Sequence, residues 1–356
     1  MTVSATWDAD GFRARVQAAL SEALDTQARR LAPLGGDAER LVAAARTSVA
    51  GGKMFRASFC WWGHHAVAPP DDAAAVLRAC AALELLHASA LVHDDLMDAS
   101  DTRRGNPSTH RAFEAEHDRA GWRGEPRQYG AAGAILLGDL LLSWSEELLR
   151  RCGLPADAVT PALEVFDLCR SEVIAGQFLD VSVQARGRAD VDTAMTVLRY
   201  KSAKYSIERP LQIGAALAGA SKGTLIQLGA FGLPLGEAFQ LRDDLLGVYG
   251  DPESTGKPAG DDLVEGKRTV LVALALDAAP PAEAAELDAA LGSALTPGQV
   301  ERLRRIIEDS GARAQVEAVI EQLGGLALEA LDRADVDDGA RDVLRGLARD
   351  VTHRAV

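Results

Sequence analysis

One segment of the chain, residues 72–98, constrains the fold most. Positions three and four residues apart along it form a single stripe, apolar for most of its length and acidic at its end, made of Val76, Cys80, Leu83, His87, Ala90, Asp94 and Asp98. This spacing is that of one face of an α-helix. We therefore expect a long helix whose apolar face is buried and whose last turn carries two carboxylates about 5–6 Å apart at Cβ.

The rest of the chain has the same helical character. Alanine and leucine dominate its 356 residues, and aromatic residues make up only 5%, a composition that favours helices over strands. Helix-patterned runs are separated by short breaks that contain glycine or proline, and none of these breaks is a long linker. We predict an all-α fold in a single domain, residues 1–356.

A second acidic cluster, Asp243-Asp244, lies about 150 positions beyond the first one, which consists of Asp94, Asp95 and Asp98. In a chain with 52 Asp and Glu residues, a single cluster of this kind is as consistent with a solvated surface as with a metal site. Two clusters, however, offer the hard oxygen ligands that Mg²⁺ prefers, and this ion takes only one or two carboxylates from a protein and completes its octahedron with water and phosphate oxygens. The pair therefore indicates a magnesium-bridged diphosphate.

Basic residues accompany both acidic clusters. Lys53 and Arg56 follow a Gly51-Gly52 turn at a predicted helix start, which is a suitable cradle for an anion. Arg103 and Arg104 follow the first acidic cluster, and Lys257 and Lys267 follow the second one. Residues 200–205 add Lys201 and Lys204. Together they supply enough positive charge for two diphosphates.

Bulk properties exclude other classes of protein. A net charge of −14 and a pI near 5.0 argue against nucleic-acid binding, which needs concentrated Lys and Arg. The four cysteines are widely spaced and are expected to be reduced thiols in the core. The N-terminus lacks a basic region followed by an apolar one, and no run reaches about 18 uninterrupted apolar residues. We expect a cytoplasmic protein without a transmembrane segment.

Five motifs resemble those of the trans-isoprenyl diphosphate synthases, the polyprenyl synthetase family, and they occur in the family's order. They are GGKMFR at 51–56, the stretch from Leu85 to His110, GQFLD at 176–180, YKSAKY at 200–205 and FQLRDDLLGVYGD at 239–251. The motif sequences are most similar to those of bacterial geranylgeranyl diphosphate synthases. The resemblance implies a large bundle of long, mostly antiparallel helices around a deep central cavity, usually in a homodimer. It also implies several Mg²⁺ ions per active site, with isopentenyl diphosphate and an allylic diphosphate as substrates.

The same resemblance assigns roles to individual residues. The implied metal ligands are Asp94, Asp95, Asp98, Asp243 and Asp244. The allylic diphosphate would contact Arg103, Lys201 and Lys257, with Lys267 near the second acidic cluster. Ser202 and Gln240 would lie beside the reacting carbons. The diphosphate of isopentenyl diphosphate would contact Lys53, Arg56, His87 and Arg104.

The chain departs from the family pattern at one position. The second acidic motif commonly ends in a third aspartate, but this chain has Gly247 there, and the next carboxylate, Asp251, comes four residues later. Which residue supplies the third carboxylate is therefore open. Asp251 could do so by acting through water. Asp243 suffices as the principal ligand if each Mg²⁺ takes few protein carboxylates.

The residues before the first acidic cluster bear on product length. The growing prenyl chain should pass Ala90 and Ser89, whose small side chains leave the upper pocket open, and then Leu86. In the family, bulky aromatic residues at the first two positions stop growth early. We therefore expect a twenty-carbon product, geranylgeranyl diphosphate, with fifteen-carbon farnesyl and twenty-five-carbon geranylfarnesyl diphosphate as alternatives.

Two other classes remain open. A class I terpene cyclase shares a helical architecture and a DDxxD motif, but it needs no basic site for isopentenyl diphosphate and usually lacks the second aspartate pair. Lys53, Arg56 and Asp243-Asp244 therefore favour the synthase. A non-catalytic partner subunit would be expected to have lost aspartates that are intact here.

Overall fold

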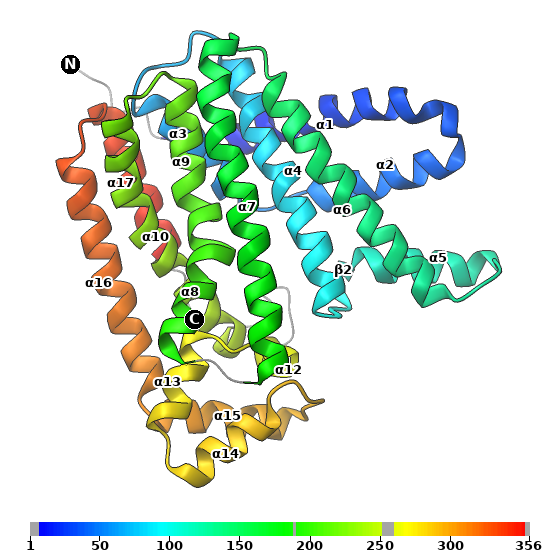
Figure 1. The fold of residues 1–356 in the computed structure, drawn as a ribbon, viewed down its shortest axis with the longest axis vertical. Helices are drawn as coiled ribbons and strands as arrows, with labels where there is room; N and C mark the ends of the chain where they lie inside the picture. Colours follow the sequence, from blue (N-terminus) through cyan, green and yellow to red (C-terminus); the bar gives the residue numbers. More distant parts are fainter. Residues whose placement is uncertain (1–6, 188–189, 251–259, 353–356) are drawn as a thin grey trace. The chain divides into compact units, whose positions relative to one another are not determined.

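The computed structural model describes residues 7–187, 190–250 and 260–352, and almost all regular structure in these residues is helical (Figure 1). The one exception in the described residues is a short hairpin of β1 (Thr102–Arg103) and β2 (Asn106–Pro107). The predicted all-α class is confirmed.

Contacts divide the chain into two compact units, which we describe separately. Unit 1 comprises Met1–Glu164 and Ile213–Ala220, and unit 2 comprises Val165–Gln212 and Ser221–Val356. The helices α7 (Ala156–Arg186) and α9 (Arg209–Leu217) each contain a boundary between units. The single domain expected from the sequence stays a prediction.

Unit 1 is organised around α4, the helix predicted from the acidic-ended stripe. The elements of this unit before α7 are α1 (Ala9–Leu31), η1 (Ala32–Leu34), α2 (Gly36–Val49), α3 (Phe55–His65), α4 (Ala73–Met97), the hairpin, α5 (Thr109–Ala120) and α6 (Pro126–Arg150). The Asp72 carboxylate caps α4 by accepting a hydrogen bond from the Ala75 N–H at 2.9 Å. Helices α1, α3 and α6 all pack against α4. Most of its side chains are consequently buried, polar Ser89 and Asp95 among them.

Helix α4 is also long and apolar enough to cross a membrane, judged by length and composition alone. The mean hydropathy of its most apolar window is 1.6, but 72% of that window is buried inside the protein. Burial of this extent is typical of a core helix. No other helix in the described residues meets the same criteria.

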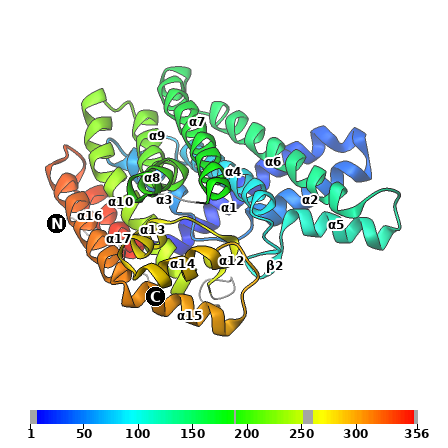
Figure 2. The ribbon, with the colours of Figure 1, turned by 60° about the horizontal axis from the view of Figure 1, so that its bottom comes forward.

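Unit 2 is organised around α10 (Lys222–Tyr249), which packs against α16 and η2. Its other elements beyond α7 are α8 (Val191–Leu198), η2 (Arg199–Glu208), α9, α12 (Asp261–Glu265), α13 (Val270–Ala278), α14 (Pro281–Ala290), α15 (Pro297–Asp309), α16 (Ala312–Arg333) and α17 (Asp338–Thr352). Helices α13, α14 and α15 lie next to one another (Figures 1 and 2). The C-terminal third, which carries no chemical motif, contributes Val316 and Ile320 to the core around Leu241 and Leu245.

The element η2 is a ten-residue π-helix in a chain that the sequence predicts to be all-α. A π-helix has i to i+5 hydrogen bonds, is rare, and occurs mostly as single turns near functional sites. Lys201 and Ser202 both belong to it. The 3.6-residue spacing of an α-helix therefore does not describe which side chains share a face of η2.

Candidate active site

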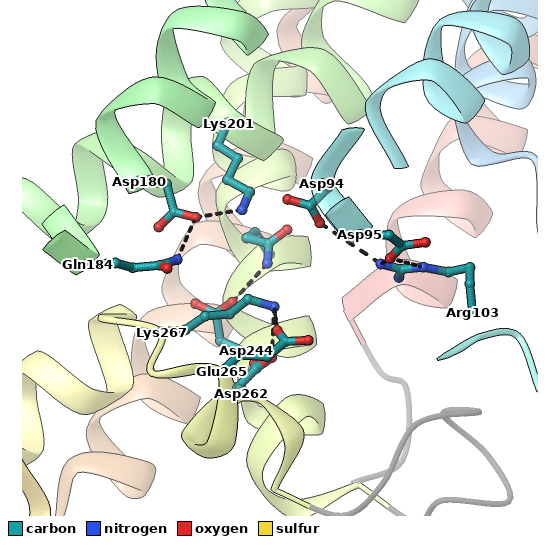
Figure 3. A network of polar contacts seen from close by, with 11 residues as sticks. Asp94, Asp95, Arg103, Asp180, Gln184, Lys201, Asp244, Asp262, Glu265 and Lys267 are labelled. Atoms are coloured by element: carbon teal, nitrogen blue, oxygen red, sulfur yellow. Dashed lines mark hydrogen bonds and ion pairs between the residues drawn. The ribbon is translucent and has the colours of Figure 1, made fainter. Parts of the chain in front are cut away.

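The first acidic cluster lies on the last turn of α4 in unit 1. Asp95 is 3% exposed, and its Oδ1 accepts a hydrogen bond from Nε of Arg103 at 2.9 Å (Figure 3). Nη2 of Arg103 also pairs with Asp95 and lies 4.0 Å from Oδ2 of Asp94. Asp98 ends the helix, where its N–H donates to the Asp94 carbonyl at 2.8 Å. The structure thus brings Arg103 and the first two predicted carboxylates together.

Arg104 lies at the tip of the hairpin and has partners other than those of Arg103. Arg104 and Gly105 form its tip with positive φ values of 51° and 75°. The Arg104 guanidinium donates to the carbonyl of Ala50 at 2.7 Å. It lies directly against Gly52, where a Cβ would be 2.9 Å from Nη2. A glycine at this position therefore allows the close approach of Arg104 to the turn before α3.

A buried carboxylate lies beside the turn that the sequence predicts as an anion cradle. Met54 adopts a left-handed conformation, φ 49°, immediately before α3 begins. Glu84 of α4 is 8% exposed and accepts the Ala57 N–H of the first turn of α3 at 3.2 Å. Burial raises the pKa of Glu84, and the charges of Arg56 and Arg104 oppose this rise. Sequence analysis missed Glu84, although it lies one helical turn before His87.

His87 is surrounded by positive charge. Its pKa is well below the ordinary value of 6.5, first because of burial and then because of Arg56, Arg104 and Arg103. A neutral imidazole in this position can donate one hydrogen bond and accept another. Three of the four residues predicted to bind isopentenyl diphosphate therefore interact in unit 1. The fourth, Lys53, is exposed on the turn itself.

The low pKa of His87 predicts an acid-dependent loss of stability. The unfolded chain takes up a proton near pH 6.5, whereas the folded chain keeps the imidazole neutral. The free energy of unfolding should therefore fall as the pH decreases below 6.5, by at most about 1.4 kcal/mol per pH unit from this group. His87→Asn should remove this contribution. The free energy of unfolding of the variant, measured in urea, should therefore rise relative to that of the wild type between pH 8 and pH 5. An equal difference at both pH values would contradict the prediction.

The second acidic cluster lies on α10 in unit 2. Asp244 is 7% exposed, and its Oδ1 accepts a hydrogen bond from Nε2 of Gln240 at 2.8 Å. Ser202 of η2 donates to Oε1 of Gln240, so that the three side chains form one chain of hydrogen bonds. The pKa of Asp244 is raised to about 7, mainly by burial and by the charge of Asp262, and further by Asp243. The Gln240 hydrogen bond and Lys267 lower it only partly.

Asp262 occupies the space in which the missing third aspartate would start. A Cβ at Gly247 would overlap Oδ2 and Cγ of Asp262. Nζ of Lys267 lies 3.1 Å from Oδ1 of Asp262 and 2.5 Å from Oε2 of Glu265 (Figure 3). Gly247, which has no side chain, thus leaves room for the carboxylate of Asp262, 15 positions later in the sequence. The other candidates in this region, Asp251 and Lys257, lie outside the described residues.

Lys201 is held by a carboxylate that the sequence analysis did not select. Its Nζ lies 2.6 Å from Oδ2 of Asp180 on α7, and Gln184 donates to the same oxygen at 3.2 Å (Figure 3). Asp180 is 7% exposed. It is the last residue of the GQFLD motif, so the resemblance already contained the signal for it.

The two residues predicted to line the prenyl pocket lie near the end of α4. Ser89 is 2% exposed, and its hydroxyl donates to the Gly138 carbonyl of α6 at 2.8 Å. Ala90 is half-buried. The hydroxyl of Ser89 therefore serves the packing of α4 on α6, and the role of both residues as pocket walls stays a prediction.

The donor set fits a hard divalent cation. Burial and the neighbouring carboxylates Asp262 and Asp243 raise the pKa of Asp244, and a bound cation would relieve the repulsion among these carboxylates. Within the described residues, no group of three or more His, Cys, Asp or Glu side chains is arranged to hold a metal on its own. Mg²⁺ takes few carboxylates from a protein when phosphate oxygens complete its shell.

Both units present carboxylates together with Arg or Lys, which are the residue types that bind a divalent metal and a diphosphate. A family model for Polyprenyl synthetase matches residues 38–309. The chain belongs to the polyprenyl synthetase family, and it is a trans-prenyltransferase.

Individual relatives agree with this family. A short chain isoprenyl diphosphate synthase from Methanothermobacter thermautotrophicus is 35% identical over 306 residues, which cover 86% of this chain and 87% of the relative. A geranylgeranyl diphosphate synthase from Mycobacterium tuberculosis is 33% identical over 298 residues, covering 82% and 79%. A crystal structure of geranylgeranyl pyrophosphate synthase from Corynebacterium glutamicum, complexed with isoprenyl diphosphate and magnesium, has a TM-score of 0.95 and 41% identity. The match covers 98% of this chain and 100% of that chain.

Proposed function

We propose that this enzyme condenses isopentenyl diphosphate with an allylic diphosphate head to tail and releases diphosphate. Dimethylallyl, geranyl and farnesyl diphosphate are the allylic substrates, and geranylgeranyl diphosphate is the main product. The observation that carries the proposal is the chain of contacts in unit 2 in which Ser202 and Gln240 meet the acidic cluster at Asp244. The similarity to a synthase crystallised with isoprenyl diphosphate and magnesium supports it.

The metal-binding carboxylates would be Asp94, Asp95, Asp98, Asp243 and Asp244, with Asp262 in the place of the missing third aspartate. When bound, Mg²⁺ would supply positive charge that stabilises the departing diphosphate. The chain's own cations for this purpose are Arg103 and Lys201, with Lys257 and Lys267. Fixed cations of this kind, directed at the atoms on which charge develops, usually make the largest contribution to catalysis.

The chemistry proceeds through an allylic cation. The allylic C–O bond breaks, both electrons leave with the diphosphate, and the Ser202 and Gln240 dipoles stabilise the cation. The double bond of isopentenyl diphosphate then forms the new C–C bond, and a proton passes to the released diphosphate. Lys53, Arg56, Arg104 and the neutral His87 would hold the diphosphate of isopentenyl diphosphate.

The requirement for a second substrate separates this activity from a terpene cyclase. Diphosphate release from an allylic substrate should need isopentenyl diphosphate and Mg²⁺, and EDTA should abolish it. Release from the allylic substrate alone, with a hydrocarbon product, would indicate a cyclase. An inactive chain that gains activity only with another subunit would indicate a partner protein.

Asp262 is expected to matter for magnesium affinity. Asp262→Ala should raise the Mg²⁺ concentration needed for half-maximal thermal stabilisation in the presence of diphosphate, by about tenfold. Gly247→Asp in the same chain should restore part of the affinity, because the space is then free. Gly247→Asp alone places a second carboxylate where Asp262 already lies and should bring no gain. An unchanged magnesium requirement in Asp262→Ala would contradict this assignment.

Product length should depend on Ala90. Ala90→Phe places an aromatic ring in the predicted pocket and should shorten the main product by at least one five-carbon unit, as measured by mass spectrometry. Ala90→Ser, a small polar control, should leave the chain length unchanged. A twenty-carbon product from Ala90→Phe would remove Ala90 from the pocket wall. Relatives are named as farnesyl, geranylgeranyl and geranylfarnesyl diphosphate synthases, so the length needs this direct measurement.

A cytoplasmic homodimer completes the proposal. In unit 2, α7 exposes Phe178 and Ile174 at 74% and 56%, with Val181 on the same side. A second copy of the chain would remove this apolar surface from water. Light scattering should then give twice the mass of 37.6 kDa, and a monomer would contradict the dimer.

A further inference from the structure

Two helices of unit 2 contact the π-helix η2, and the contacting residues on each of them are four positions apart. On α7, the contacts come from Glu172, Gly176 and Asp180. On α10, they come from Gly232, Gly236 and Gln240. Residues at i, i+4 and i+8 lie along one face of a helix. Both helices therefore present a continuous face to η2.

The glycines bring the backbones into direct contact. A Cβ at Gly176 would overlap the backbone of Tyr200 and Lys201, and one at Gly236 would overlap the backbone of Ala203. At Gly232, a Cβ would be 2.9 Å from Cα of Glu208. These contacts fit the backbone of η2 closely, but a glycine offers no directional bond. Polar side chains can add the directional bonds that fix the position of η2 along the two helices.

Glu172 supplies these bonds. Nζ of Lys204 lies 2.6 Å from its Oε1, and Nη2 and Nε of Arg209 lie 2.8 Å and 2.7 Å from its two oxygens. Lys204 is in the middle of η2, and Arg209 is the first residue of α9. One carboxylate therefore fixes the centre and the end of the π-helix. Burial alone would raise the pKa of Glu172, but the hydrogen bonds from Arg209 and Lys204 outweigh it and lower the pKa.

The cluster is a poor device for stability alone. Glu172, Glu208 and Arg209 are each no more than 9% exposed. Burying charges costs desolvation energy that the ion pairs often fail to return, and apolar residues of similar size are commonly as stable. Among the described residues, Oε2 of Glu208 is buried without a hydrogen-bond partner, which adds to the cost. A cluster of this kind is better explained by the need for one defined arrangement.

What Glu172 arranges is the part of η2 that carries Lys201 and Ser202. Lys201 pairs with Asp180 two turns after Glu172 on α7, and Ser202 donates to Gln240. We propose that Glu172 is a positioning residue that, through Lys204 and Arg209, keeps the π-helix in the register at which Lys201 and Ser202 meet their partners. This inference rests on the proposed function, in which these two residues stabilise the departing diphosphate and the allylic cation.

The test compares Glu172→Gln with Asp167→Asn. The control removes the charge of an exposed residue on the same helix, which pairs only with neighbouring Arg170 among the described residues. Glu172→Gln should lower kcat about tenfold or more, because small misplacements of catalytic groups have effects of this size. KM for both substrates should change less than about threefold, and Asp167→Asn should behave as the wild type.

A second comparison separates positioning from general destabilisation. If Glu172 acts through Lys201, the penalty of Glu172→Gln should shrink at least about threefold in a Lys201→Met background. An equal penalty in both backgrounds, or a folded Glu172→Gln variant with wild-type kcat, would overturn the inference. If Glu172→Gln does not fold, Lys204→Met, which leaves the pair of Glu172 and Arg209, is read in the same way. A wild-type chain without prenyltransferase activity would instead overturn the proposed function and this inference with it.

Discussion

Asp243→Ala is expected to lower kcat about a thousandfold or more. Asp243 is the principal carboxylate of the second acidic cluster in the proposed site, and removing one preorganised electrostatic group from such a site costs two to three orders of magnitude, about 3–4 kcal/mol. Its neighbour Asp244 has its own place in the proposed metal site and is hydrogen-bonded to Gln240, so it should not take over the role of Asp243 as well. Steady-state rates at saturating Mg²⁺ and both substrates give the effect.

Asp251→Ala serves as the matched comparison, because this residue is the next carboxylate after Gly247 in the sequence. Its loss should be milder if Asp243 carries the metal. Equal losses in both variants would overturn this order. Thermal unfolding of both proteins without metal checks that neither substitution unfolds the chain.

Gly236→Ala is expected to destabilise the protein by about 3 kcal/mol or to block folding, and to remove activity. The new Cβ would overlap the carbonyl oxygen, carbon and Cα of Ala203. These are backbone atoms, so the overlap can be relieved only by moving η2 away from α10, and overpacking of this kind typically costs about 1–3 kcal/mol or more. The shift would also separate Ser202 from Gln240. Urea unfolding and kcat report the two effects.

Gly325→Ala is the control for this substitution. Gly325 lies inside α16, and nothing lies within 4 Å of the position that its Cβ would take. Alanine favours helices over glycine by up to about 1 kcal/mol, so this variant should be slightly more stable than the wild type. If Gly236→Ala proves as stable and active as Gly325→Ala, the close packing of η2 on α10 is wrong.

Much of unit 1 could be predicted because its signals are local. The stripe that ends in Asp94 and Asp98 predicts a helix at residues 72–98, and the structure has α4 at Ala73–Met97. The Gly51-Gly52 turn, the start of α3 at Phe55 and the order of the motifs are equally readable from short windows. Helical periodicity and glycine turns depend on neighbours in the sequence, which is why they transfer.

The parts that the sequence could not predict depend on distant contacts. Nothing local indicates that Asp262 fills the space beside Gly247, or that Glu84 caps α3 through Ala57. The π-helix was also missed, because its register comes from Glu172 and from glycines on α7 and α10. In each case the side chain contacts a segment that is distant in the sequence, and no short sequence window contains both.

The most direct test of the central claim is the mass of the product. Purified protein is incubated with Mg²⁺, ¹³C-labelled isopentenyl diphosphate and dimethylallyl, geranyl or farnesyl diphosphate, and the dephosphorylated products are sized by mass spectrometry. We predict linear prenyl alcohols that gain one labelled five-carbon unit per condensation and accumulate at twenty carbons. Unlabelled cyclic hydrocarbons, or no product that contains label, would contradict the account.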